Sequence, residues 1–128
     1  MSAWGTMRRT LLPARSAGSL SWLAHRLTGI ALALYLVPHF VSIHSALGGP
    51  AAFDRSLAAL RGPIFRAAEY LLVGAVAFHL FNGLRIIAID FLNVTGQQRL
   101  LLWLALAATA AVLAAASVLF LPGILGLP

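Results

Sequence analysis

The chain has 128 residues, of which 61% are hydrophobic and only 9% are charged, and its formal net charge is +6. A soluble domain is about half apolar and about a quarter charged, and so short a chain cannot hide this much apolar surface from water. The composition therefore excludes an ordinary soluble domain, and the absence of cysteine excludes disulfides and thiolate metal sites.

Three stretches without Asp, Glu, Lys or Arg organise the chain into a single membrane-anchor domain over residues 1–128. They are Leu27–Phe53, Tyr70–Leu84 and Leu100–Pro128. The first and third exceed the ~20 residues needed to cross the bilayer, and helical character extends the second on both sides. The predicted fold class is an all-α membrane protein with three transmembrane helices.

In chain order, residues 1–21 are expected to form an N-terminal surface segment, with Ser19 or Ser21 capping the first helix. The predicted transmembrane helices cover residues 22–46, 66–92 and 99–121. We expect Pro38 to kink the first helix. A short helix is expected in the loop that follows, at 51–60, and the third helix is expected to stop at Pro122-Gly123.

Positive charge is distributed unevenly over the two sides of this arrangement. All nine basic residues are arginines; six lie in the N-terminal part or flank the second loop, and three lie in the first loop. Cytoplasmic segments of membrane proteins carry an excess of arginine and lysine. The pattern predicts a multi-pass protein with a cytoplasmic N-terminus, in the cell inner (plasma) membrane in preference to the mitochondrial inner membrane. With arginines placed this way, no nucleic-acid partner is expected.

His79 lies deep in the second predicted helix, with apolar neighbours on both sides. Eleven residues of helix separate it from Asp90, or roughly 16 Å. His79, Gly83, Ile86 and Asp90 fall on one helix face. Imidazole is a common axial ligand of haem iron, and Gly83 leaves room for a flat macrocycle. An interhelical hydrogen bond from a buried histidine fits the same pattern, so both interpretations stay open at this point.

A second group of polar residues meets at one membrane boundary, because the first two helices run antiparallel. It comprises Ser21, Trp22, His25, Arg26, Arg85 and Asp90. Such a cluster offers donors for a quinone carbonyl and cations for haem propionates. A belt of interfacial Trp and Arg anchors has the same composition, so this alternative also stays open.

His39 lies thirteen residues beyond Arg26, or roughly 20 Å into the membrane. Two interpretations are open for this histidine. It is a candidate ligand for a second haem, and it is also placed to donate a hydrogen bond to a backbone carbonyl that Pro38 leaves free.

Three segments resemble the cytochrome b subunit of succinate dehydrogenase, in particular the small C-type anchor of bacterial complexes with two anchor chains. They read Ser21-Trp-Leu-Ala-His-Arg-Leu-Thr-Gly29, His79-Leu-Phe-Asn-Gly-Leu-Arg85 and Ile89-Asp90-Phe91. The resemblance covers about residues 19–91. The third helix agrees in hydropathy alone.

The resemblance implies that His79 is an axial ligand of haem b iron, with the opposite ligand from a histidine of a D-type anchor. His25 and Arg26 match a pair beside the haem propionates and the quinone pocket. Arg85 and Asp90 match residues at the same boundary, near that pocket.

The chain departs from the family pattern at one position of the quinone pocket. The better-known members have a quinone-contacting serine four residues before the arginine, and Trp22 stands at this place here. Ser21 is one residue earlier, so the role of the serine does not carry over to it directly.

The implied function is that of an anchor subunit in succinate:quinone oxidoreductase, complex II of electron transport and the tricarboxylic acid cycle. The subunit would belong to an enzyme without being catalytic alone, in a haem-binding helix bundle formed by several chains. The implied partners are a flavoprotein subunit, an iron–sulfur subunit, the D-type anchor and a quinone, either ubiquinone or menaquinone. The alternatives are a fumarate reductase anchor and a structural anchor without haem.

Overall fold

The structure is a computed structural model that describes residues 17–127, so the predictions for residues 1–16 lie outside it. Three long helices dominate: α2 (Ala17–His44), α4 (Pro63–Leu92) and α5 (Gln98–Leu125). The connections contain the 3-10 turns η1 (Ser45–Gly48) and η2 (Thr95–Gln97) and the short helix α3 (Pro50–Ala58). No strand occurs within residues 17–127.

All three long helices are suited to a membrane. By length and composition, three segments are able to cross it: Gly18–Gly48, Pro63–Leu92 and Thr95–Leu125. Large apolar side chains are exposed along each of them, among them Leu34 on α2, Leu71 on α4 and Val118 on α5. Such surfaces are stable against lipid or other helices, and each helix satisfies its own backbone hydrogen bonds. The predicted all-α, three-span fold class is confirmed.

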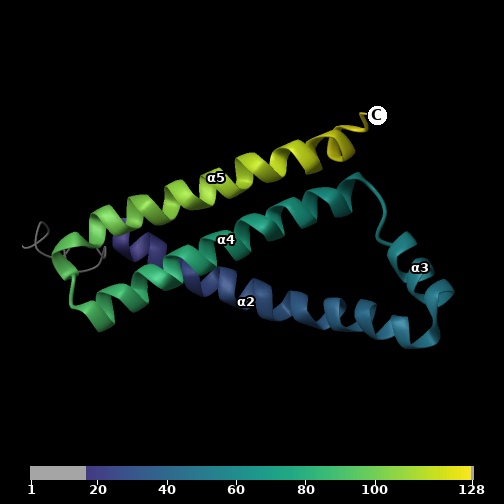
Figure 1. Ribbon diagram of the computed structural model, residues 1–128, viewed down its shortest axis with the longest axis horizontal. Coiled ribbons are helices and arrows are strands. Elements are labelled where there is room, and N and C mark those ends of the chain that lie inside the picture. The colour runs from purple at the N-terminus through teal and green to yellow at the C-terminus, as the bar shows by residue number, and fades with distance from the viewer. Residues whose placement is uncertain (1–16, 128) are drawn as a thin grey trace, which may run out of the picture.

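The long helices do not pack equally against one another. Figure 1 shows α5 running beside α4, whereas α2 crosses α4 near one end and diverges from it toward α3. Small residues permit the close α4–α5 contact. A Cβ on Gly74 would lie 3.2 Å from Cδ2 of Leu113, and Tyr70 Oη lies 2.9 Å from Ser117 Oγ. The buried side chains of this contact are Ala77, Leu102, Ala105 and Thr109.

The start of α2 differs from the prediction. Residues 17–21, expected in a surface segment, are already helical. Ser21 is not a cap: it is buried one turn inside the helix, and its hydroxyl donates to the Gly18 carbonyl at 2.9 Å. A serine inside a helix commonly returns its hydroxyl to a carbonyl one turn earlier. The helix runs to His44 and then tightens into η1, so its regular part is shifted toward the N-terminus.

The end of α5 also differs from the prediction, because the helix passes through Pro122 and ends three residues later, at Leu125. Gly126 then adopts the left-handed conformation with φ 68°. The Leu127 amide bonds to the Pro122 carbonyl at 2.8 Å, which is the closing bond of a Schellman cap. Gly126 is therefore the stop signal.

The second helix begins three residues earlier than expected, at Pro63, because proline suits the first helical position.

Candidate functional site

His79 of α4 faces α2 where the two helices cross. Its Nδ1 lies 3.1 Å from the His25 carbonyl oxygen and 3.2 Å from Thr28 Oγ1. The Thr28 hydroxyl lies 2.9 Å from the Ala24 carbonyl and 2.9 Å from that of His25, so its proton is engaged there. Because a carbonyl only accepts, Nδ1 of His79 carries the ring proton. The lone pair is then on Nε2, which has no hydrogen-bond partner among residues 17–127.

The imidazole of His25 stacks on that of His79. The ring centroids are 4.0 Å apart and the planes differ by 10°. Stacking covers a face of the His79 ring and leaves the in-plane lone pair of Nε2 free for a metal ion. Nδ1 of His25 is itself buried, without a partner among the residues the structure describes. A buried polar atom without a hydrogen-bond partner costs free energy, so the unpaired Nδ1 favours a ligand at this place.

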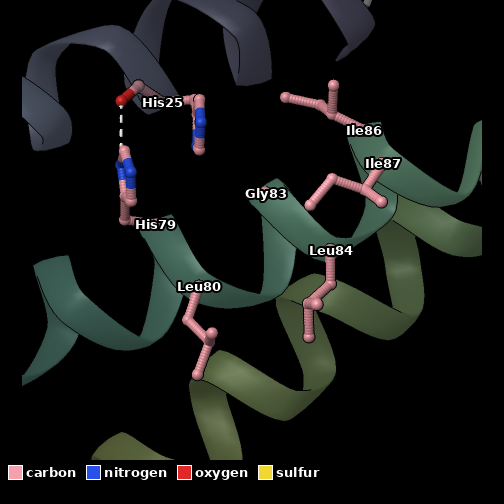
Figure 2. Close-up of a pocket in the computed structure, with 7 residues that line it drawn as sticks. All are labelled: His25, His79, Leu80, Gly83, Leu84, Ile86 and Ile87. Atoms are coloured by element: carbon pink, nitrogen blue, oxygen red, sulfur yellow. Dashed lines mark hydrogen bonds between the residues drawn. The ribbon is translucent and has the colours of Figure 1, made fainter. Parts of the chain in front are cut away.

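Two glycines make room for these rings between the helices. A Cβ on Gly29 would lie 3.0 Å from Cε1 of His79, and one on Gly83 would lie 3.3 Å from Cε1 of His25. Beside the rings is a largely apolar groove of about 370 Å³. Figure 2 shows both rings in the space between α2 and α4. The groove is lined by His25, His79, Leu80, Gly83, Leu84, Ile86 and Ile87.

A second groove, of about 330 Å³, lies toward the membrane boundary at the start of α2 and the end of α4. Ile86 lines both grooves, so the two are neighbours on one face of α4. Its lining is more polar than that of the first groove and includes one acid and one cation. The lining residues are Gly18, Trp22, Arg85, Ile86, Ile89, Asp90 and Gln98.

Arg85 is held at this boundary by hydrogen bonds that it donates to groups on α2, α4 and α5. Its Nη1 donates to Ser21 Oγ at 3.3 Å and to Asn82 Oδ1 at 3.2 Å. Its Nε donates to the Gln98 carbonyl at 3.3 Å. Sequence reasoning missed Asn82 and Gln98. The available signal was that Asn82 is a polar residue within a charge-free membrane stretch.

Two sequence candidates lie apart from these grooves. The Arg26 guanidinium is exposed and stacks over the Trp22 ring at 4.2 Å, and Arg26 lines neither groove. His39 lies on the part of α2 that diverges from α4. It is exposed, and its Nδ1 lies 3.1 Å from the Tyr35 hydroxyl. No group of three or more His, Asp or Glu side chains that could hold a metal ion occurs among the described residues.

Comparisons with known proteins match the sequence to membrane subunits of one enzyme. Succinate dehydrogenase 2 membrane subunit SdhC of Mycobacterium tuberculosis is 38% identical over 88 residues, 68% of this chain and 65% of that protein. A succinate dehydrogenase hydrophobic membrane anchor subunit of Halobacterium salinarum is 33% identical over 59% of this chain and 58% of that protein. One of Archaeoglobus fulgidus is 35% identical over 56% and 61%.

The chain thus spans less than two thirds of the length of the relatives it matches. A family profile described as "Succinate dehydrogenase/Fumarate reductase transmembrane subunit" matches residues 5–120, which is most of the chain. The chain belongs to the family of succinate dehydrogenase/fumarate reductase transmembrane subunits.

Proposed function

We propose that this chain is the membrane-anchor cytochrome b subunit of a succinate:quinone oxidoreductase, binding haem b and helping to form its quinone-reduction site. The observation that carries the proposal is the state of His79. Its Nδ1 donates a hydrogen bond to the His25 carbonyl, and its Nε2 lone pair is free beside an apolar groove. A histidine ligand is commonly oriented in this way, through a hydrogen bond from its other ring nitrogen.

The residues present fit a haem group. His79 would hold the iron through Nε2, and Gly83 with the apolar lining of the groove would admit the flat ring. The buried Nδ1 of His25, which has no partner among the described residues, would bond to a haem propionate. Arg26, near the same boundary, would supply a positive charge for the propionates. Haem b, when bound, supplies a one-electron redox centre close to the boundary groove.

A second ligand for the iron would come from another chain. The His25 ring stacks face to face on the His79 ring, so the two imidazoles do not point their nitrogens at one common atom between them. A second anchor chain with an intramembrane histidine would complete the site. His39, on the diverging part of α2, is the candidate for a second haem.

The boundary groove is the proposed quinone site. Arg85 would donate a hydrogen bond to a quinone oxygen, and the ring of Trp22 would form an apolar wall. Reduction of a quinone to a quinol takes two electrons and two protons. The electrons would come from succinate through a flavoprotein and an iron–sulfur subunit docked on the cytoplasmic side. The Asp90 carboxylate, which lines the groove, would pass protons from the aqueous boundary to the quinone oxygen.

The first test is a dithionite-reduced minus oxidised absorbance spectrum of the purified membrane complex, wild type beside His79→Ala. A b-type signal that disappears or falls sharply in the variant supports ligation by His79. A residual signal in the variant points to a second haem and to His39. Absence of any b-type signal in an intact wild-type complex supplied with haem overturns the cytochrome assignment and leaves a structural anchor.

Fumarate reduction is the second candidate, since the family description covers both enzymes. Succinate oxidation is favoured by the names of the three relatives, all of which are subunits of succinate dehydrogenase. Comparison of succinate-dependent quinone reduction with quinol-dependent fumarate reduction in the same membranes decides between the two directions.

A further inference from the structure

Asn82 is the most deeply buried polar side chain among residues 18–127, with no solvent-exposed area. Both ends of its amide are bonded. Nδ2 donates to the Ser21 carbonyl at 3.4 Å, and Oδ1 accepts from Nη1 of Arg85 at 3.2 Å. A buried amide costs free energy unless its hydrogen bonds are made, and these bonds tie the arginine of α4 to the first turns of α2.

The Arg85 side chain lies between two grooves on different sides of α4 and lines both of them. One is the boundary groove with Trp22 and Asp90, and the other is a groove between α4 and α5 lined mostly by leucine and alanine. Asn82 and Ser21 both accept from the same nitrogen, Nη1. Both acceptors lie at the α2–α4 contact, and the Gln98 carbonyl at the start of α5 accepts from Nε. Because Gln98 lines the boundary groove and not the groove between α4 and α5, these three bonds hold the guanidinium beside the boundary groove.

The bonds to Arg85 leave part of its guanidinium unused. Nη2 has no hydrogen-bond partner among residues 17–127, and within the same residues no carboxylate forms an ion pair with Arg85. A guanidinium presents five N–H donors in a fixed plane, so fixing Nη1 and Nε also fixes the direction of the Nη2 donors. An unpaired charge with free donors is suited to an acceptor on a ligand.

We propose that Asn82 is a positioning residue that holds Arg85 so that its free donors meet a quinone carbonyl oxygen in the boundary groove. This inference rests on the proposed function. Without the Asn82 oxygen, Arg85 keeps its charge but loses the more deeply buried of the two side-chain acceptors that hold Nη1 at the α2–α4 contact. The effect of Asn82 on the quinone is therefore exerted through Arg85.

The test is a double-mutant cycle on the membrane complex, with succinate as donor and a short-chain ubiquinone or naphthoquinone as acceptor. Asn82→Leu keeps the number and branching of the side-chain heavy atoms and removes both hydrogen bonds, whereas Asn82→Asp keeps an acceptor for Arg85. Because a hydrogen bond to a charged group is among the stronger ones, its loss in Asn82→Leu should raise the quinone KM about tenfold or more. Asn82→Asp should keep KM within about threefold of wild type.

The decisive comparison is made in an Arg85→Gln background. There Asn82→Leu should change the quinone KM by less than about twofold, because the residue it positions is gone. An Asn82→Leu effect of equal size in both backgrounds, or an unchanged KM in Asn82→Leu itself, overturns the proposal. The yield of assembled complex and the haem content per complex are measured for every variant, to separate positioning from folding.

If Asn82→Leu does not assemble, Asn82→Ala is measured in the same cycle, since it leaves a gap at the α2–α4 contact without a clash. The same additive or null result overturns the proposal. A wild-type complex that reduces no quinone is a different outcome: it contradicts the proposed function itself. Failure of the Asn82 inference requires a wild type that does reduce quinone.

Discussion

The two ring nitrogens of His79 differ in their hydrogen bonding, because a backbone carbonyl of α2 lies beside only one of them. Nδ1 donates to the His25 carbonyl, one turn before Gly29 on α2, and Nε2 has no hydrogen-bond partner among residues 17–127, which is what the proposed ligation of iron needs. This arrangement needs the backbones of α2 and α4 to approach closely, which Gly29 and Gly83 permit. At the scale of single residues, the glycines are thus as necessary to the proposed haem site as the histidine.

Gly29→Ala is expected to lower the haem content of the complex. The added Cβ would lie 3.0 Å from Cε1 of His79, and that ring cannot move aside without lengthening its bond to His25. Overpacking of this kind costs about 1–3 kcal/mol, whereas alanine alone favours a helix over glycine by about 1 kcal/mol. Haem per assembled complex, measured as pyridine haemochrome, should therefore fall.

Gly96→Ala is the matched control, because an added Cβ at Gly96 meets nothing within 4 Å. It should leave both assembly and haem content at the wild-type level. Equal haem in the two variants would show that the close approach of Gly29 to His79 is not needed for the site.

The residue scale also shows what sequence reasoning reaches and what it misses. Depth and helix face were enough to select His79, Gly83 and Asp90, since both follow from spacing along one helix. Asn82 and Gln98 were missed because their partners lie on other helices, and only the packing brings them to Arg85. The stacking of His25 on His79 was likewise beyond sequence spacing, because it depends on how closely α2 and α4 approach.

At the scale of elements, helix existence was predictable from hydropathy, and helix ends were not. The three spans follow from long charge-free stretches, but the last turn of α5 depends on a cap formed by Gly126 and Leu127. A proline near the end of a helix is a weaker stop signal than a left-handed glycine followed by a residue whose amide bonds back to the last turn of the helix. The packing of α4 on α5 also rests on small residues, which an alanine-rich sequence offers in many registers.

Gly74→Val is expected to destabilise the α4–α5 pair without disturbing the haem. Even a Cβ at this position would lie 3.2 Å from Leu113 Cδ2, and valine adds two more methyl groups. The cost should be about 1–3 kcal/mol, seen as a lower midpoint of thermal disassembly of the detergent-solubilised complex. Ala114→Val adds the same methyl groups at an exposed position of α5 and serves as control. Equal midpoints for the two variants would contradict the close packing.

At the scale of the whole molecule, this chain exposes more apolar surface than three helices can cover for one another. The part of α2 beyond the crossing with α4 is exposed on nearly every side and includes Leu34, Phe40 and Ile43. Lipid is able to cover such side chains, but the proposed haem site would also need a second ligand from another helix near His79. The open side of the groove beside His79 and the diverging part of α2 are consistent with the proposal of an anchor that is completed by a second chain.

The orientation of the molecule decides on which side the boundary groove lies, and the absence of cysteine makes it directly measurable. In the sequence, six of the nine arginines precede the first span, lie near its start or flank η2, and three lie between the first and second spans or near the start of the second. The positive-inside rule therefore predicts that η2 faces the cytoplasm. In intact spheroplasts, a membrane-impermeant maleimide should label Ala59→Cys and not Gly96→Cys. Opening the membranes under denaturing conditions should expose both, which controls for cover by soluble subunits. The reverse pattern would place the groove, and the docking of any electron donor, on the opposite face.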